Sequence, residues 1–309
     1  MVKSMFSGVS GLRAHQQKMD VIGNNIANVN TWGYKAGTYS FKDAVYQTVA
    51  SSTGGNVTAG GAGGKNASQV GYGTGTGSIS TSFKTGGMAT SDSPLDCMID
   101  GTGFFIVGSM NTGGIAIGGN LSTSGLSLSR VGIFTTDDNG YLVDNSGNYI
   151  YGAQSTMNVD GTTSTLAGVL TPIKVPAYVA VAGDPAGKTA YEIQSYSISE
   201  DGTVIGVDKD TSRTIVIGQI ALAAVENPNG LEKTAGYYYS IGANAGDVTA
   251  NLTNGGALGK IKSGYLEQAN VDLAKEFSEM ITTQRGFQAN SKIITVTDEM
   301  LEQLVNMKR

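Results

Sequence analysis

Residues 270–309 read NVDLAKEFSEMITTQRGFQANSKIITVTDEMLEQLVNMKR and predict one long helix. A hydrophobic residue recurs at every seventh position, and these residues are Leu273, Met280, Phe287, Ile294 and Leu301. This period is typical of a helix that lies along a second helix, as in a coiled coil. Asn270 is the predicted N-cap, because its side-chain oxygen can accept a hydrogen bond from an amide of the first turn.

The N-terminus carries the same heptad period, and residues 4–28 predict a second helix. Its stripe consists of Met5, Leu12, Met19 and Ile26. Matched stripes at both ends of the chain predict that the termini pair, although two amphipathic helices packed on one globular body would give the same period. The second seam of the C-terminal helix is predicted at Phe277, Gln284, Ser291, Asp298 and Val305. Three of these five are polar, so we expect several subunits to supply the missing contacts.

The middle of the chain has the pattern of short antiparallel strands joined by tight turns. The sequence contains 45 Gly and only 5 Pro, and Gly with Ser, Thr and Asn suits such turns. We therefore predict an α+β multidomain protein, in which a discontinuous helical coiled-coil domain flanks a mainly antiparallel β region. The predicted parts are residues 1–33 with 271–309 (helical, axial core), 34–77 (extended arm and Gly-rich loop, the loop from 51 to 77), 78–152 with 191–270 (β domain) and 153–190 (irregular; small insertion or reduced outer domain).

Charge and composition exclude several functional classes. A net charge of −5 gives little attraction for a phosphate backbone, which argues against nucleic-acid binding. No run of about 20 apolar residues is present to span a membrane. The first fifteen positions, where a cleavable secretory signal would need an apolar segment, contain Lys3, Ser4, Ser7, Gly8 and Ser10. The single Cys, Cys97, excludes an internal disulfide and is predicted to be a small buried residue.

The motifs for catalysis and cofactor binding are incomplete. Gly64-Lys65 is followed by Asn66, whereas a phosphate-binding loop needs Ser or Thr. Ile106 stands where a dinucleotide-binding motif beginning at Gly101 needs its third Gly. The acidic turn at residues 137–139 could bind calcium, but Asp and Asn also serve turn geometry alone. The single His, His15, lacks partners for zinc or for a catalytic triad. We predict no enzyme, no catalytic or metal site and no cofactor.

The two terminal segments resemble the signatures of the bacterial flagellar rod and hook family. The N-terminal resemblance lies in residues 10–12 and in residues 24–35, which read NNIANVNTWGYK. The C-terminal resemblance lies in residues 270–277 and 280–290. Further similar segments are Val70-Gly71-Tyr72-Gly73, Pro94-Leu95-Asp96, residues 100–105 and residues 218–221. Residues 94–96, 270–273 and 288–290 resemble the hook type more than the distal-rod type, whereas the short 153–190 segment keeps the distal rod as an alternative.

The resemblance implies a mechanical function. It implies a subunit that polymerises with copies of itself into a curved flexible tube and transmits torque from rod to filament as a universal joint. It also implies assembly with the distal rod protein, the hook cap protein and the hook–filament junction protein. Export would use the flagellar type III apparatus, without a cleaved signal peptide, to an extracellular position in the flagellum. A secreted Gly-rich β adhesin is a remoter alternative, but it needs no paired heptad termini.

The family motifs also mark residues at the junction between helix and arm, for which two interpretations stay open. These residues are Asn24, Asn25, Asn28, Asn30, Thr31, Gly33 and Tyr34. They can end the helix and pack locally, or they can contact a neighbouring subunit. Gln284 and Arg285 lie in the middle of the C-terminal helix, and we expect Gln284 to form a hydrogen bond between subunits.

Overall fold

The computed structural model describes residues 2–55, 63–110, 114–122, 124–157, 164–175, 178–180, 190–209, 214–252 and 258–307. The chain forms two compact units. The helical unit consists of Met1–Val29, Ala36–Ser82 and Val271–Arg309, and the β unit consists of Asn30–Lys35 and Phe83–Asn270. The fold is mainly β, with one helix at each end of the chain.

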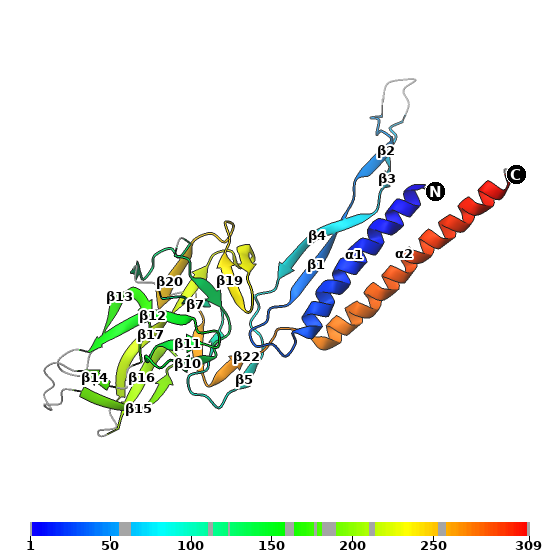
Figure 1. Ribbon diagram of the computed structural model, residues 1–309. Coiled ribbons are helices and arrows are strands. Elements are labelled where there is room, and N and C mark those ends of the chain that lie inside the picture. The colour runs from blue at the N-terminus through cyan, green and yellow to red at the C-terminus, as the bar shows by residue number, and fades with distance from the viewer. Residues whose placement is uncertain are drawn as a thin grey trace. The chain divides into compact units, whose positions relative to one another are not determined.

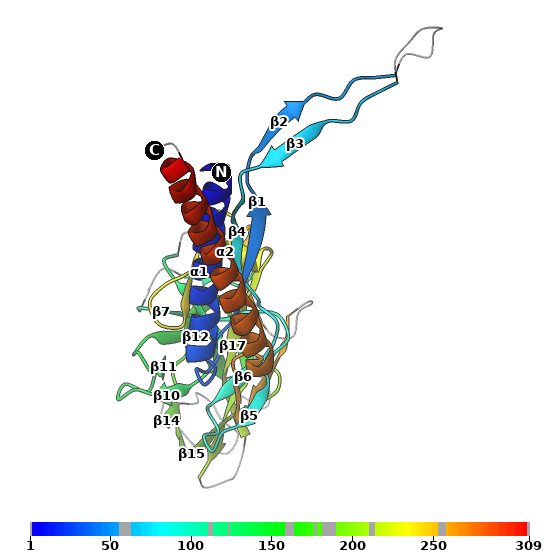
Figure 2. The ribbon, with the colours of Figure 1, turned by 90° about the vertical axis from the view of Figure 1, so that its right-hand side faces the viewer.

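The helical unit contains two long helices that lie side by side and run in opposite directions (Figure 1). Helix α1 spans Val2–Ala27 and helix α2 spans Leu273–Met307. Two antiparallel pairs of strands complete the unit: β1 (Gly37–Asp43) pairs with β4 (Thr74–Thr81), and β2 (Tyr46–Ala50) pairs with β3 (Ser68–Gly71). The β1–β4 pair lies along α1, and the β2–β3 pair continues the same hairpin (Figure 2).

The start of α2 corrects the predicted N-cap. Asp272 Oδ1 accepts hydrogen bonds from the backbone amides of Ala274 (3.0 Å) and Lys275 (3.2 Å), so Asp272 caps the helix. Asn270 instead donates its side-chain amide to the carbonyl of Lys84 at 3.1 Å, within the β unit. Both residues are favoured N-cap types, and only the backbone path decides between them.

The predicted Gly-rich loop from Ser51 to Gly77 was too long. Ser68–Gly71 and the first half of β4 are paired strands, and β4 extends to Thr81 beside β1. The helical unit accordingly continues to Ser82. Thr, Ser and Gly alternate in β4 without a large apolar residue before Ile79, so the period of two that marks a strand is weak there. The part of the predicted loop at residues 56–62 lies outside the described residues.

The β unit is built around one large antiparallel sheet. Its main path runs β14-β15-β16-β17-β12-β7-β9-β19-β18, with β8, β10, β11, β13 and β20 attached to it. The strands are β7 (Phe104–Gly108), β8 (Ile115–Ala116), β9 (Ser127–Ser129), β10 (Phe134–Thr136), β11 (Leu142–Asp144), β12 (Tyr149–Met157), β13 (Ser164–Pro172), β14 (Tyr178–Ala180), β15 (Ala190–Ile198), β16 (Thr203–Asp208), β17 (Thr214–Val225), β18 (Leu231–Lys233), β19 (Tyr238–Ile241) and β20 (Val248–Leu252).

Two short pairs accompany the large sheet. β5 (Met88–Thr90) pairs with β22 (Tyr265–Glu267), and β6 (Cys97–Asp100) pairs with β21 (Lys260–Ser263). A single 3-10 turn, η1, spans Pro228–Gly230. In each of these two pairs a strand from the start of the β unit meets one from its end, so both chain ends of the unit are held together.

The core of the β unit lies on both faces of β7 and β17. Phe105 belongs to one hydrophobic cluster, whereas Phe104 and Ile106 belong to the other. In β17, Ile220 and Ala221 divide in the same way. A strand that is buried on both faces must be apolar at consecutive positions, which explains its continuous hydrophobic run.

The free Cys97 is fully buried in the first of these clusters, as the sequence predicted. Burial raises the pKa of its thiol, with a smaller contribution from Asp96. The side chain therefore behaves as a small apolar residue of the core.

The prediction that residues 153–190 are irregular is wrong for the part of this segment that the structure describes. Residues 153–157 complete β12, and β13 pairs with β12 from Tyr151↔Pro172 to Met157↔Ser164. β12 also pairs with β17, so this hairpin belongs to the large sheet. The small residues Ala, Ser, Thr and Gly are frequent in residues 153–157 and 164–172, which obscures the alternation there. The rest of the segment, except residues 173–175, β14 and Ala190 at the start of β15, lies outside the described residues.

Candidate functional site

The surface between α1 and α2 is closely packed because glycines lie at the points of contact. A Cβ added to Gly8 would lie 3.2 Å from Ile294 Cγ1, and one added to Gly286 would lie 2.6 Å from the His15 ring. Small residues let two helix backbones approach each other, and the approach increases van der Waals contact. The Lys18–Glu279 ion pair (3.1 Å) closes the edge of this contact.

The predicted heptad residues differ in their exposure. Met5, Leu12, Met19, Ile26, Met280, Ile294 and Leu301 are all half-buried. Leu273 and Phe287, in contrast, remain 40% and 37% exposed. The stripe is therefore only partly covered in the isolated chain. Packing of the two helices in the coiled-coil manner stays a prediction.

The second seam of α2 is displaced by one residue from the prediction. Glu276, Thr283 and Thr297 are buried and Asn290 is half-buried, at the same spacing of seven. The hydroxyl of Thr283 donates to the carbonyl of Glu279 (2.6 Å), and that of Thr297 donates to the carbonyl of Ile293 (2.5 Å). These bonds within the helix satisfy the hydroxyls, so the two threonines can be buried. Of the predicted seam, only Ser291 is half-buried, and the other four residues are exposed.

Asn25 joins three segments of the helical unit. Its side chain donates to the carbonyl of Gly37 and accepts from the amide of the same residue, both at 2.9 Å. It also donates to Glu276 Oε2 at 3.3 Å. Asn25 is 1% exposed, and an amide side chain with both its donor and acceptor used is well suited to burial. In this chain, Asn25 therefore connects α1 to the start of β1 and to α2.

The other predicted junction residues divide between the two units. Asn28 donates its side-chain amide to the carbonyl of Asn24 at 2.9 Å, which ends α1. Asn30 and Thr31 are exposed in the β unit. Tyr34 is buried there, with the Lys233 ammonium 4.5 Å from its ring centre. The junction residues are therefore divided between the helical unit and the β unit. Gln284 and Arg285 are exposed on α2, so contact with another subunit stays a prediction.

Gly33 follows this junction in the left-handed region of the backbone, with φ of 64°. A Cβ at this position would lie 2.8 Å from Val131 Cγ2. Both the backbone conformation and the close contact therefore require glycine.

His15 lies on α1 between Gly286 and the ring of Phe41, whose centre is 5.4 Å from that of the imidazole. Its Nδ1 is buried without a hydrogen-bond partner among the described residues. Burial lowers the pKa of His15 from its ordinary value of 6.5, and the charge of Lys18 lowers it further. The neutral imidazole therefore belongs to the helix contact.

The helical unit exposes many large apolar side chains. On α2 they are Leu273, Phe277, Ile281, Phe287, Ile293, Val296, Met300, Leu304, Val305 and Met307. On the strands they are Phe41, Tyr46, Val49, Val70 and Ile79. Soluble monomers rarely leave a large apolar surface open, and such surfaces mark sites of protein interaction. We call the α2 residues of this list the α2 apolar face.

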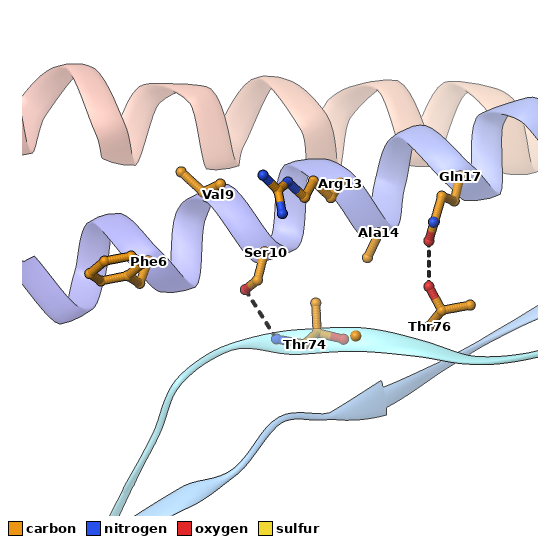
Figure 3. Close-up of a pocket in the computed structure, with 9 residues that line it drawn as sticks. Phe6, Val9, Ser10, Arg13, Ala14, Gln17, Thr74 and Thr76 are labelled. Atoms are coloured by element: carbon orange, nitrogen blue, oxygen red, sulfur yellow. Dashed lines mark hydrogen bonds between the residues drawn. The ribbon is translucent and has the colours of Figure 1, made fainter.

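A groove of about 350 Å³ runs between α1 and β4 within the helical unit (Figure 3). Hydrogen bonds from the amide of Thr74 to Ser10 Oγ (3.3 Å) and from the hydroxyl of Thr76 to Gln17 Oε1 cross it. Exposed Phe6 and Arg13 lie along its α1 side. Arg13 forms no ion pair within the described part of the chain. The groove thus presents an apolar side chain and a free cation.

The described residues hold no group of three or more His, Cys, Asp or Glu side chains placed to bind a metal ion. Within the same residues, neither helix is both long and apolar enough to cross a bilayer. Sequence reasoning missed Glu276, Thr283 and Asn290 as contact residues and Arg13 as a groove residue. The sequence shows the seven-residue spacing of Glu276, Thr283 and Asn290, but these residues are polar and so were not assigned to the hydrophobic stripe.

Two family models match the ends of the chain. The model described as "Flagella basal body rod protein" matches residues 5–35, and that described as "Flagellar basal body rod FlgEFG protein C-terminal" matches residues 262–307. These segments include most of α1 and all of α2. The helix pair is therefore the part of the chain that carries the family signatures.

Relatives match over the whole chain. The flagellar basal-body rod protein FlgG of Bacillus subtilis is 39% identical, with all of both chains covered. The flagellar hook protein FlgE of Borreliella burgdorferi is 27% identical, again with all of both chains covered, over an alignment of 445 positions. Among solved structures, the Helicobacter pylori hook protein FlgE2 aligns at 10% identity with a TM-score of 0.40, covering 58% of this chain and 100% of that one.

These matches define a structural protein of the bacterial flagellum. The chain belongs to the flagellar rod and hook protein family. This confirms the resemblance seen in the sequence.

Proposed function

We propose that the protein is an axial subunit that polymerises with copies of itself through its helical unit. The observation that carries the proposal is the α2 apolar face, in which Phe277 is 50% and Ile281 is 58% exposed. Burying a large apolar side chain contributes about 1.5–3 kcal/mol, so a row of them favours association strongly. The family membership supports a tubular assembly, in which head-to-tail contacts along a helical path give open-ended growth.

Two rows of residues within the α2 apolar face support contacts with more than one neighbour. Leu273, Phe277 and Ile281 follow one another at intervals of four, whereas Val296, Met300 and Leu304 do so nearer the C-terminus. With 3.6 residues per turn, the centres of the two rows lie about 140° apart around the helix. One neighbouring helix covers one flank, so the proposal needs at least two neighbours, with Gln284 forming a hydrogen bond at one of these contacts.

Within the family we propose the hook, a curved tube that transmits torque from rod to filament. The motifs at residues 94–96, 270–273 and 288–290 support this assignment, as does the match of hook relatives across the whole chain. The helices would form permanent coiled-coil contacts. The β units would slide on one another as the tube rotates.

The distal rod is the second candidate, and a specific observation favours it. The rod protein of Bacillus subtilis aligns at 39% identity over only 310 positions, so its length is close to that of this chain. The hook protein of Borreliella burgdorferi needs an alignment of 445 positions. A straight, rigid tube would follow from this assignment.

The proposed partners follow from the same assignment. They are further copies of the chain, the distal rod protein, the hook cap protein, the hook–filament junction protein and the flagellar type III export apparatus. We propose an extracellular position in the flagellum, reached by that export route.

Electron microscopy of polymers grown from the purified protein tests the proposal. Curved tubes are the result expected for the hook. Straight tubes would transfer the assignment to the distal rod. A full-length chain that stays monomeric over a wide range of salt and protein concentrations would contradict both.

A further inference from the structure

The chain passes between its two units four times, after Val29, Lys35, Ser82 and Asn270. On the β-unit side these passages form three connecting segments: residues 30–35, the start at residues 83–87, and the end at residues 267–270. The sequence separates them widely. Inside the β unit, however, all three converge on the carboxylate of one residue, Glu267.

Glu267 binds the first two connecting segments directly. Its Oε1 accepts from Lys35 Nζ at 2.7 Å and from the amide of Gly86 at 2.8 Å. Its backbone carbonyl accepts from the amide of Gly33 at 2.8 Å. Glu267 and Lys35 are each 2% exposed, so water does not compete for these bonds. Hydrogen bonds to a buried charge are stronger than those between neutral groups.

Secondary contacts join the same segments to one another. Lys35 Nζ donates to the carbonyl of Lys84 at 2.9 Å, and the Asn270 side chain donates to that carbonyl at 3.1 Å. The amide of Gln268 donates to the carbonyl of Gly87 at 2.8 Å. Each connecting segment is therefore bound to both of the others.

Arg130 connects this group to the sheet. Its Nε lies 3.1 Å from Glu267 Oε2, and its Nη1 and Nη2 donate to the carbonyls of Gly103 (2.5 Å) and Gly101 (2.7 Å). These carbonyls belong to the turn between β6 and β7. The buried group thus holds two cations and one carboxylate, and burial together with Arg130 lowers the pKa of Lys35. Removing the only carboxylate would leave both cations without a counter-charge, which is strongly destabilising in an interior.

We propose that Glu267 is a positioning residue that clamps the connecting segments together and anchors them, through Arg130, to the β6–β7 turn. A mechanical load that reaches the β unit through one connecting segment is then distributed over all three. The clamp itself rests on the geometry within the β unit. Its mechanical use, which is to keep the connections from opening while the tube turns, rests on the proposed function.

Hydrogen exchange of the purified monomer tests the clamp. In Glu267→Gln, the amides of Gly33, Gly86 and Gln268 should exchange at least about tenfold faster, since opening of these segments no longer breaks the charge-assisted bonds of the Glu267 carboxylate with Lys35 and with the amide of Gly86. Amides of the central strands, such as those of Phe105 and Leu222, should keep their rates. Glu232→Gln is the matched control, because this glutamate is exposed on β18, and it should change none of them.

A second variant keeps the test decisive if Glu267→Gln does not fold. Lys35→Met removes one of the two cations and leaves Glu267 paired with Arg130. It should accelerate exchange of Gly33 and Gly86 by a smaller factor than Glu267→Gln. The clamp would be overturned if Gly33 and Gly86 exchanged in both variants at the rates of the wild-type protein. If Glu267→Gln does not fold, wild-type rates in Lys35→Met alone would overturn it.

An assembled sample separates the clamp from the proposed function. If polymers form, trypsin should cut after Lys84 faster in Lys35→Met polymers than in wild-type polymers, whereas equal rates would contradict the clamp in the tube. If no polymer forms from the wild-type chain, the proposed function fails, and exchange in the monomer still decides on the clamp.

Discussion

Gly11 of α1 lies against the side chain of Asn290 on α2: a Cβ at Gly11 would lie 2.7 Å from Asn290 Nδ2. That distance is shorter than any normal van der Waals contact. The two helices therefore approach each other at a point where one residue has no side chain and the other is polar.

Gly11→Ala should be neutral or destabilising in the wild-type chain, although Ala in a helix is favoured over Gly by about 1 kcal/mol. In an Asn290→Ala background the space is free, and the same substitution should then stabilise by about that amount. Thermal unfolding followed by far-UV circular dichroism measures both effects. Equal effects of Gly11→Ala in the two backgrounds would show that the contact is absent.

The pKa of His15 predicts a pH dependence of the helical unit. Because burial lowers this pKa in the folded chain, the unfolded chain binds the proton more readily, and stability rises with pH. The contribution is complete above the ordinary pKa of 6.5 and is lost as the pH falls below it. Between about pH 7.5 and 5.5, wild-type protein should lose more stability than His15→Gln, in which this titration is absent. Parallel pH profiles of the two proteins would exclude the effect.

Gly33→Ala should destabilise the β unit. A residue with a side chain loses about 1–2 kcal/mol in the left-handed region, and the new Cβ would also meet Val131. Chemical denaturation of the variant measures the loss. Gly147→Ala is a suitable control, because its φ is also positive (80°) but nothing lies within 4 Å of the added Cβ. A loss at Gly33 no larger than that at Gly147 would show that the contact with Val131 contributes nothing.

Arg13→Glu should reduce assembly without unfolding the chain. The side chain is exposed in the groove and has no ion pair among the described residues, so reversal of its charge disturbs only a contact with another molecule. Sedimentation of polymer, beside circular dichroism of the monomer, measures the two properties. Lys260→Glu, a reversal at an exposed position of the β unit, serves as the control and should leave the yield unchanged. Undiminished polymer yield in Arg13→Glu would remove the groove from the subunit interface.

The sequence predicted those elements in which a hydrophobic repeat continues over many residues. Both terminal helices are of this kind, because a hydrophobic repeat that continues over many turns is typical of a long packed helix and of little else. The family, in contrast, was recognised from motif residues near the two ends of the chain. The second helix seam was misplaced for a related reason. Thr283 and Thr297 are polar in the sequence, but their hydroxyls bind their own helix, which makes them suitable for a buried contact.

Long-range polar contacts could not be predicted from sequence pattern. Lys35 and Glu267 are 232 residues apart, and neither lies in a motif that marks a buried charge. Residues 153–157 of β12 and the whole of β13 were missed because frequent small residues obscure their alternation, although β12 pairs with both β13 and β17. Such elements are specified by tertiary pairing more than by local propensity.

The central claim is that other copies of the chain cover the α2 apolar face. The most direct test replaces Phe277 and Ile281 by Ser together and follows polymer formation by sedimentation and electron microscopy. Both side chains are at least half exposed in the isolated chain, so the monomer should keep its circular dichroism spectrum and remain soluble. We predict that the double variant forms no tubes under conditions in which the wild-type chain does. Tubes of normal yield and shape from the double variant would contradict the claim.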